Sequence, residues 1–330
     1  MRPDKTLLFN RSSFENLLTS QDYIQAVEKA HILHASHHII KTDLIHADAP
    51  EGEYHIKTGG LLDQTPYYGL KCNGGFFSNS KKFNLPNILG IIYLSNASNA
   101  YPLAIFESTT ISTMRTAAAT TIAAKYLKPD APIHLGVIGY GNQAAAQLLM
   151  LIENIKVETI TVSGRNPEKA TKFADSLKSK VQHPITTTSI EDLCLNSNII
   201  ITCTPSTTPF ISRKWIQPGT FIGAVGADSP GKSELDPKLM KTAKIVADIK
   251  NQVITVGESQ HAIQQNIISP DDIYCELGEL LINKKKGRTN AKEIFIYDST
   301  GTAIQDIATA AYIYEKLKNN DTIPSINFFG

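Results

Sequence analysis

The sequence predicts an α/β protein with a doubly wound parallel sheet and a second, smaller α+β domain. From Ile133 onward, short apolar runs alternate with helical patterns. Such alternation is typical of right-handed βαβ units, in which helices cover both faces of a parallel sheet. Before Ile133, β-rich runs and short helices are mixed without regular alternation, which indicates a different architecture. A glycine-rich turn follows the first strand of the alternating part.

The alternating part contains six predicted strands. Each is a short apolar run bounded by turn residues, which is typical of a strand buried on both faces. A last helix is predicted over 303–317, because Ile304, Ile307, Ala311 and Tyr314 form one apolar stripe. The predicted strands cover 133–138, 157–162, 198–203, 221–225, 244–247 and 293–297.

The first part of the chain is predicted to begin with a strand over 7–10 and helices over 13–18 and 22–35. The runs 88–94 and 101–106, separated by a polar turn, predict an antiparallel pair. An alanine-rich helix over 112–127 ends at a proline, which marks a domain boundary. We therefore predict one domain from 1–127 with 305–330, and a second domain from 128–304.

The stretch Gly139–Ala144 matches G-x-G-x-x-A between a predicted strand and a predicted helix. This is the setting that the dinucleotide fingerprint of a Rossmann-type domain requires. Gly139 allows the tight turn, Gly141 allows backbone N–H groups to approach a pyrophosphate, and Ala144 allows close packing of helix on strand. The helix N-terminus, predicted at Ala144 with Asn142 and Gln143 just before it, attracts the anion. A purely structural glycine turn is the alternative.

The end of the second strand of the alternating part bears on the choice of cofactor. NAD-specific sites usually place Asp or Glu there, whereas this chain has Ser163, Gly164, Arg165 and Asn166. A guanidinium with no carboxylate beside it suits a 2′-phosphate, so NADP(H) is slightly favoured within an NAD(P) site. A surface arginine in a loop is the alternative.

Composition excludes several classes of function. A net charge of +1 gives no reason to expect nucleic acid or a membrane surface as a partner. No apolar run approaches the roughly 20 residues of a membrane span. The cysteines lack metal-ligand spacing and no signal peptide is apparent, which predicts a cytoplasmic protein. His34, His37 and His38 have a spacing that can hold a metal, but a polar helix end explains them, and we predict no metal site.

Ligands of open α/β sheets lie beyond the carboxyl ends of the strands. Asp228 follows a predicted strand there and can act as general acid and base, although a turn aspartate that caps its own backbone is equally compatible. Neighbouring positions in the three loops at such ends are assigned to the cofactor. They are Cys203, Thr204, Gly226, Lys232 and Ser299.

Several motifs give the chain a resemblance to the ornithine cyclodeaminase/mu-crystallin family over nearly its whole length. The most specific are M-R-T-A-A at Met114–Ala118 and GADSPGKSEL at Gly226–Leu235. Gly69–Asn73, the fingerprint, Glu276–Glu279 and Asp298–Asp306 also match. The resemblance implies that the smaller domain binds substrate and forms a homodimer.

The resemblance also implies roles for individual residues. Lys71 and Arg115 would bind the carboxylate of a small amino-acid or imino-acid substrate, which suits a point charge and a planar fork. Lys71 would also take part in catalysis, with Asp228 as acid and base. Thr116 and Asn87 match positions near the cofactor, and Thr300 one near the substrate.

Two departures from the family pattern affect the choice of substrate. Cyclodeaminases carry an early arginine, where this chain has Leu44 or Ile45, and a glutamate before the lysine-bearing strand, where it has Lys57. A lysine there would repel the δ-ammonium of ornithine and attract a carboxylate.

Three functions remain open. The first, our main prediction, is an ornithine cyclodeaminase that converts L-ornithine to L-proline and ammonia through an internal hydride loop on NAD(P). The second is an NAD(P)H-dependent ketimine reductase or amino-acid dehydrogenase, for example a Δ1-pyrroline-2-carboxylate reductase. The third is a non-catalytic binder of NADPH and a small ligand, as implied by the mu-crystallin resemblance.

Overall fold

The computed structural model describes residues 5–329 and divides into two compact units. Unit 1 comprises the chain up to Arg115 together with Thr302 onward, and unit 2 comprises Thr116–Gly301. The boundaries predicted from sequence lie at 127/128 and 304/305, whereas the first structural boundary falls inside the continuous helix α3 (Ser108–Leu127). Residues 1–4 and 330, which the predicted first domain includes, lie outside the described residues.

Unit 1 is built on a seven-stranded sheet in the described part of the chain, with the order β15-β1-β6-β5-β4-β3-β2. The strands β2 to β6 form an antiparallel meander, and β1 pairs with β6 in parallel. The elements are β1 (Thr6–Phe9), η1 (Arg11–Ser13), α1 (Ser20–Ala35), β2 (Ile39–Ala49), β3 (Gly52–Leu61), β4 (Tyr67–Gly75), α2 (Asn79–Lys82), β5 (Ile88–Asn96), β6 (Pro102–Glu107), the first turns of α3, α11 (Ala303–Leu317) and β15 (Ser325–Ile326).

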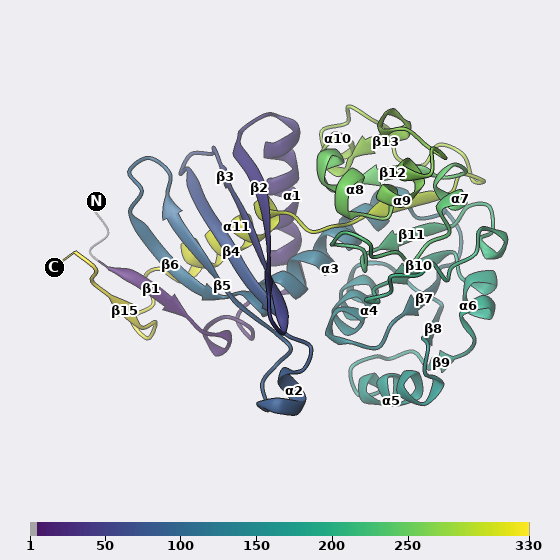
Figure 1. The fold of residues 1–330 in the computed structure, drawn as a ribbon, viewed down its shortest axis with the longest axis horizontal. Coiled ribbons are helices and arrows are strands. Elements are labelled where there is room, and N and C mark those ends of the chain that lie inside the picture. The colour runs from purple at the N-terminus through teal and green to yellow at the C-terminus, as the bar shows by residue number, and fades with distance from the viewer. Residues whose placement is uncertain (1–4, 330) are drawn as a thin grey trace. The chain divides into compact units, whose positions relative to one another are not determined.

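Helix α11 packs against one face of this sheet, mainly on β3 and β4, and α1 packs on α11 (Figure 1). Gly69 allows the close approach of α11, because a Cβ added there would lie only 3.3 Å from Ile307. Since alternate strand residues point to opposite faces, Lys57 and Lys71, which pair across β3 and β4, lie on this helix-covered face.

Unit 2 contains a parallel sheet of eight strands, in the order β13-β12-β14-β11-β10-β7-β8-β9. The chain runs outward from β7 to β9 on one side and then crosses to β10 on the other, which makes a topological switch point between β7 and β10. The elements are β7 (His134–Ile138), α4 (Asn142–Asn154), β8 (Thr159–Ser163), α5 (Pro167–Leu177), β9 (Ile185–Thr187), α6 (Ile190–Asn196), β10 (Ile199–Thr202), η2 (Arg213–Trp215), β11 (Phe221–Ala224), α7 (Pro237–Met240), β12 (Lys244–Ala247), α8 (Lys250–Val256), α9 (Ser259–Gln264), η3 (Pro270–Asp272), β13 (Ile273–Glu276), α10 (Leu277–Leu281) and β14 (Phe295–Asp298).

Helices cover both faces of the unit 2 sheet. A Cβ added at Gly136 would meet Leu193 of α6, and one added at Gly223 would meet Thr120 of α3. The two glycines occupy opposite faces, because Gly136 and Gly223 align with the adjacent residues Ile200 and Ile201 of β10. The predicted doubly wound, Rossmann-type fold of this part is therefore confirmed.

Most predicted elements are present, with ends that shift by one to four residues. The antiparallel pair β5–β6 is confirmed, and the predicted strand 244–247 and helix 303–317 have the observed bounds. The helix predicted over 13–18 is wrong. Only the 3₁₀ turn Arg11–Ser13 forms there, capped by Asn10, because that side chain accepts from the Ser13 amide and closes a local turn instead of starting a helix.

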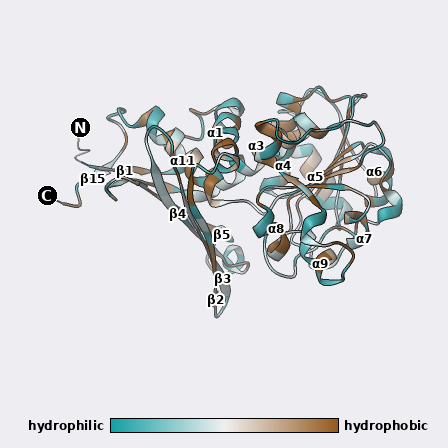
Figure 2. Cartoon of the chain, turned by 90° about the horizontal axis from the view of Figure 1, so that it is seen from above, coloured by the Kyte–Doolittle hydropathy of each residue, from teal (hydrophilic) through white to brown (hydrophobic). Residues whose placement is uncertain are grey.

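Apolar side chains concentrate in the strands, which Figure 2 colours largely brown. Their largest fully buried members include Phe106 and Ile92 in unit 1, and Phe221 and Tyr297 in unit 2. Within residues 5–329, none of the helices combines the length and the apolar character needed to cross a bilayer.

We expect Gly69→Ala to lower the free energy of unfolding by about 1–3 kcal/mol, the usual cost of overpacking. The new Cβ would lie 2.5 Å from the carbonyl oxygen of Tyr93 in the neighbouring strand, and this backbone atom cannot move without disturbing the sheet. Gly75→Ala in the same strand is the control, since its Cβ would have no neighbour closer than 3.7 Å. Urea unfolding followed by circular dichroism measures both; equal losses would contradict the packing argument.

Candidate functional site

The fingerprint in unit 2 forms the turn between β7 and α4. Gly139 has φ of +129°, which only glycine adopts readily, and its amide donates to the Ser163 carbonyl at 2.9 Å. Gly141 is the N-cap of α4 and has no side-chain hydrogen bond, and a Cβ added there would have no neighbour within 4 Å. The first amides of α4 have no partner within the helix, and the space beside Gly141 is open, which fits a dinucleotide pyrophosphate.

The start of this helix differs from its predicted position. Helix α4 begins at Asn142 and not at Ala144, so Asn142 and Gln143 belong to its first turn. Gly141, with extended backbone at φ of −102°, serves as N-cap and lets the helix begin directly after the turn. Ala144 is fully buried.

At the end of β8, two of the three residues assigned to the cofactor have structural partners. The Ser163 hydroxyl donates to the Thr188 carbonyl at 2.7 Å, and Asn166 caps α5 by accepting from the Lys169 amide at 3.0 Å. Arg165 is exposed. The strand end carries no carboxylate, so Arg165 is the charged group of this segment that a cofactor would meet.

Glu234 joins the loops after β10 and β11, which carry Cys203, Thr204 and Gly226. Its buried carboxylate accepts from the Thr204 amide at 2.7 Å and from the Gly226 amide at 2.9 Å. The Thr202 hydroxyl donates to it at 2.6 Å. Burial raises the pKa of Glu234. Cys203 is half-buried, and desolvation raises the pKa of its thiol, which argues against a nucleophilic role.

Three more buried carboxylates order the neighbouring loops. Glu258 accepts from the Glu234 amide at 2.7 Å, and Asp298 accepts from the Ser259 amide at 2.9 Å. Asp248 accepts from the amides of Thr300 at 2.8 Å and Gly301 at 2.7 Å. Such charge-assisted bonds to backbone amides fix loop conformation firmly.

Burial and mutual repulsion act on these acids together. Burial, with Glu234 and Asp298 nearby, raises the pKa of Glu258 well above its usual value. Burial raises the pKa of Asp298 to about 7. No role was predicted for these acids from the sequence. Asp248 and Asp298 stand directly after and at the end of strands, which was the available signal, whereas Glu234 and Glu258 lie in loops or beside helices.

Thr300 and Ser299, assigned to substrate and cofactor, lie in this ordered region. The Thr300 hydroxyl donates to Asp248 at 3.0 Å. Ser299 is buried, and its amide donates to the Ala224 carbonyl at 3.0 Å.

Asp228 lies in the loop after β11, with a side chain that is 48% exposed. Its Oδ1 accepts from Lys232 Nζ at 2.5 Å and from the Ser229 hydroxyl at 3.1 Å. Lys232 was assigned to the cofactor, and it contacts Asp228 directly. Because Asp228 is accessible and held by a lysine, it can exchange a proton with a ligand.

A compact charge cluster occupies unit 1. Lys71 of β4 and Arg115 of α3 both contact Asp306 of α11, at 2.6 Å from Nζ to Oδ2 and 2.8 Å from Nε to Oδ1. These three side chains are at most 6% exposed. Lys57, also buried, is the cross-strand partner of Lys71. The structure thus brings together the three cations that sequence analysis assigned to substrate.

Further polar groups extend this cluster. Arg115 donates to Gln305 Oε1 at 2.9 Å, and Gln305 Nε2 lies 2.9 Å from Nε2 of the buried His31. Lys71 donates to the Ser112 hydroxyl at 3.1 Å. Asp306, Gln305 and His31 were missed by the sequence analysis. A carboxylate beside the apolar stripe of the last helix was the available signal, since a buried carboxylate needs a charged partner.

Positive charge predominates in this cluster among the described residues, because Lys57, Lys71 and Arg115 lie near Asp306. Desolvation lowers the pKa of Lys71 to about 7, an effect that Arg115 and Lys57 strengthen and Asp306 opposes. The pKa of Asp306 is lowered, because Arg115 and Lys71 outweigh the effect of burial. The excess of positive charge suits a carboxylate ligand.

Asn87 and Thr116, which were assigned to the cofactor, differ in their surroundings. Asn87 Oδ1 accepts from the Ser80 amide at 3.1 Å and so orders the segment around α2. Thr116 is buried in α3, one residue after Arg115.

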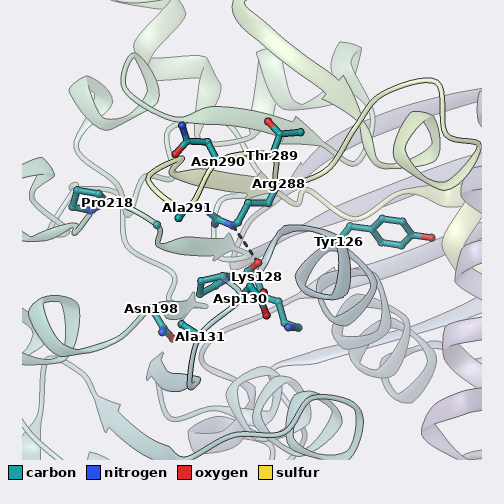
Figure 3. A pocket seen from close by; sticks show the side chains of 12 residues that line it. Tyr126, Lys128, Asp130, Ala131, Asn198, Pro218, Arg288, Thr289, Asn290 and Ala291 are labelled. Carbon is teal, nitrogen blue, oxygen red and sulfur yellow. Dashed lines mark hydrogen bonds between the residues drawn. The ribbon is translucent and has the colours of Figure 1, made fainter.

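A cavity of about 500 Å³ lies at the amino ends of the strands of the unit 2 sheet (Figure 3). Its lining includes Ala131, Asn198, Gly219 and Ala291, each of which precedes a strand, so it opens at the amino ends. Arg288 donates there to the Lys128 carbonyl at 3.1 Å (Figure 3). This cavity is therefore separate from the fingerprint, which follows the carboxyl end of β7.

We expect Asp306→Asn to lower the free energy of unfolding by about 3–5 kcal/mol, because it leaves buried cations without a counter-charge. Lys71→Met should cost less, since Asp306 keeps its contact with Arg115. Urea unfolding of the two variants beside the wild type measures the difference. If Asp306→Asn were the milder change, the carboxylate would not be what stabilises the cluster.

Comparison with known proteins assigns a family. The profile of the ornithine cyclodeaminase/mu-crystallin family matches residues 4–321. An archaeal alanine dehydrogenase dimer with bound NAD superimposes with a TM-score of 0.92 at 31% identity, covering 98% of this chain and 100% of that one.

Two further solved structures are similar over their whole length. The Δ1-pyrroline-2-carboxylate reductase of Thermococcus litoralis, in complex with NADH and L-proline, has a TM-score of 0.91 at 31% identity and covers 97% of this chain and 100% of that one. The iminosuccinate reductase of Paracoccus denitrificans, in complex with NAD+, has a TM-score of 0.91 at 28% identity and covers 98% and 99%. The chain belongs to the ornithine cyclodeaminase/mu-crystallin family.

Proposed function

We propose that this protein is an NAD(P)H-dependent reductase of small 2-imino acids, or an amino-acid dehydrogenase that catalyses the reverse reaction, oxidation of a 2-amino acid to the imino acid. The observation that carries the proposal is the buried cluster of Lys57, Lys71 and Arg115 around the single carboxylate of Asp306. Such a site suits the carboxylate that every 2-imino, 2-oxo or 2-amino acid carries.

The same cluster argues against the cyclodeaminase that was our main prediction. Ornithine brings a δ-ammonium as well as a carboxylate, and that group needs an acidic or neutral partner. Lys57, directly opposite Lys71 in the strand register, supplies a third positive charge instead. The relatives described above, an alanine dehydrogenase and two imino-acid reductases, also favour the alternative function.

Reduction of an imine adds a hydride to carbon and a proton to nitrogen. A reduced nicotinamide, when bound, supplies the hydride. In the proposal, Arg115 and the lysines fix the substrate carboxylate, so that a single face of C2 is presented. Asp228 exchanges the proton with the substrate nitrogen, and Lys232 holds the Asp228 carboxyl in place.

The cofactor is proposed to bind at the β7–α4 turn, with its pyrophosphate at the N-terminus of α4. Arg165, with no carboxylate at the end of β8, favours NADP(H), whereas the solved relatives hold NAD, NADH or NAD+. Competitive titration of NADH and NADPH, with Arg165→Ala as the variant, decides between them.

We propose a homodimer that forms through the open face of the unit 1 sheet. This face, opposite Lys57 and Lys71, exposes Ile45, Tyr54 and Ile91. An uncovered apolar sheet face of this kind is typical of a subunit interface.

In the described residues the four cysteines form no disulfide, which is compatible with the predicted cytoplasmic location.

We expect NADPH or NADH to be consumed when the purified protein receives Δ1-pyrroline-2-carboxylate, or pyruvate with ammonia. The absorbance of the reduced cofactor is followed for each combination of cofactor and substrate. L-Ornithine with catalytic NAD+ or NADP+ is tested in parallel. Asp228→Asn should remove turnover while leaving cofactor affinity nearly unchanged.

Proline formation from ornithine without net cofactor consumption would overturn the proposal and restore the cyclodeaminase. Cofactor binding without turnover of any of these substrates would point instead to the non-catalytic binder.

We expect a carboxylate ligand to bind more weakly as the pH rises through about 7. Lys71 is a cation below its pKa of about 7 and neutral above it, so each further pH unit should weaken binding by up to about tenfold. Isothermal titration of pyrrole-2-carboxylate between pH 6 and 9, with NADPH present, measures this dependence. Lys71→Arg keeps its charge throughout, and its profile should be flat; a flat wild-type profile would contradict the assignment.

A further inference from the structure

A second cluster of ligand-type side chains lies on the hairpin of β2 and β3 in unit 1. His46 and His55 are directly opposite each other in the strand register, and Asp48 is directly opposite Glu53. Because side chains two residues apart in a strand point to the same face, all four lie on one face of the hairpin. Asp48 and Glu53 lie on the far side of the histidine pair from Lys57.

The ligand atoms of His46, Glu53 and His55 are close enough to share one ion, whereas Asp48 is 93% exposed and contacts only His46 of this group. His46 Nε2 lies 3.1 Å from Asp48 Oδ1 and 3.6 Å from Glu53 Oε2, and His55 Nε2 lies 3.1 Å from Glu53 Oε1. Four ligands at the usual zinc distances of about 2.0–2.1 Å are separated by about 3.3 Å along each tetrahedral edge. The observed separations scatter around this value.

Among residues 5–329, His46, Glu53 and His55 are the one group of three or more such side chains whose ligand atoms converge, all within 4.8 Å. His34, His37 and His38, which the sequence analysis considered and set aside, form no such group there. Glu53 and His55 are partly buried, at 30% and 20% exposure of their side chains, and are therefore restrained.

We propose that His46, Glu53 and His55 bind one divalent transition-metal ion of the zinc type, with water in the fourth position. Two imidazoles and a carboxylate form a donor set that suits Zn²⁺, and the carboxylate reduces its charge. The ion would link β2 to β3 near the end of the hairpin and fix its register, which in turn positions Lys57, two residues from His55.

The sequence predicts no metal site, because the ligand-type residues of this hairpin are brought together only by its strand register. His46 and Asp48 precede the turn of the hairpin, while Glu53 and His55 follow it. Only the antiparallel register brings the two pairs together, and no single helix or loop carries a recognisable ligand spacing.

The test uses the full-length protein, freed of any histidine tag and of metal by a chelator, and titrated with ZnCl2 in an isothermal calorimeter. We expect one Zn²⁺ per chain. His46→Ala/His55→Ala should weaken binding by more than about 100-fold, because losing a second-shell partner alone costs 10- to 100-fold. His38→Ala, an exposed histidine of the same unit, is the matched control and should bind as the wild type does.

A second readout guards against misfolding of the alanine variant. Excess Zn²⁺ should raise the melting temperature of the wild type and of His38→Ala, but not of a His46→Gln/His55→Gln variant that keeps similar size and polarity. Absence of a bound ion in the wild type, or equal affinity in the His46/His55 variants, would overturn the proposal. Calorimetry and melting temperature report ion binding without turnover, and the reductase assay reports turnover without ion binding, so failure of either proposal can be told apart.

Discussion

The carboxylate of Asp306 holds together three elements of unit 1, namely β4, α3 and α11. Its oxygens form ion pairs with Lys71 of β4 and Arg115 of α3, and its own helix, α11, packs on the sheet. In an environment with little water, two cations so close together are stable only with this anion between them. The cluster proposed to bind substrate and the docking of α11 therefore depend on the same carboxylate.

Buried charges also order unit 2, but there the charged groups are carboxylates and their partners are backbone amides. There, buried carboxylates of Glu234, Glu258, Asp248 and Asp298 accept from backbone amides at the carboxyl edge of the sheet. The loops that surround a cofactor are thus fixed by side chains that need not touch it. Preorganisation of this kind is what allows a site to act without reordering during each reaction cycle.

Local signals made much of the fold predictable. The turn at Gly139, the strand before it and the helix after it are adjacent in sequence, so the fingerprint could be found and its fold inferred. Lys71 and Arg115 were assigned through family resemblance, because nothing local distinguishes them from solvated cations. Asp306 was missed for the opposite reason, since it is 191 residues from Arg115 and only tertiary packing pairs them. The prediction of a helix over 13–18 was wrong because Asn10 closes a local turn that competes with a helix.

The division of unit 1 between the two ends of the chain affects how the protein is made. Synthesis delivers β2 to β6 and Arg115 first, then the whole of unit 2, and Asp306 only with the final helix. Until that helix leaves the ribosome, Lys71 and Arg115 have no anion to pair with, so the nascent sheet cannot close its core. The whole of unit 2 is synthesised before α11, so unit 2 can fold before unit 1 is complete. A chain that ends before α11 therefore contains all of unit 2 but leaves the sheet of unit 1 without the helix that covers it and without the anion that pairs with its buried cations.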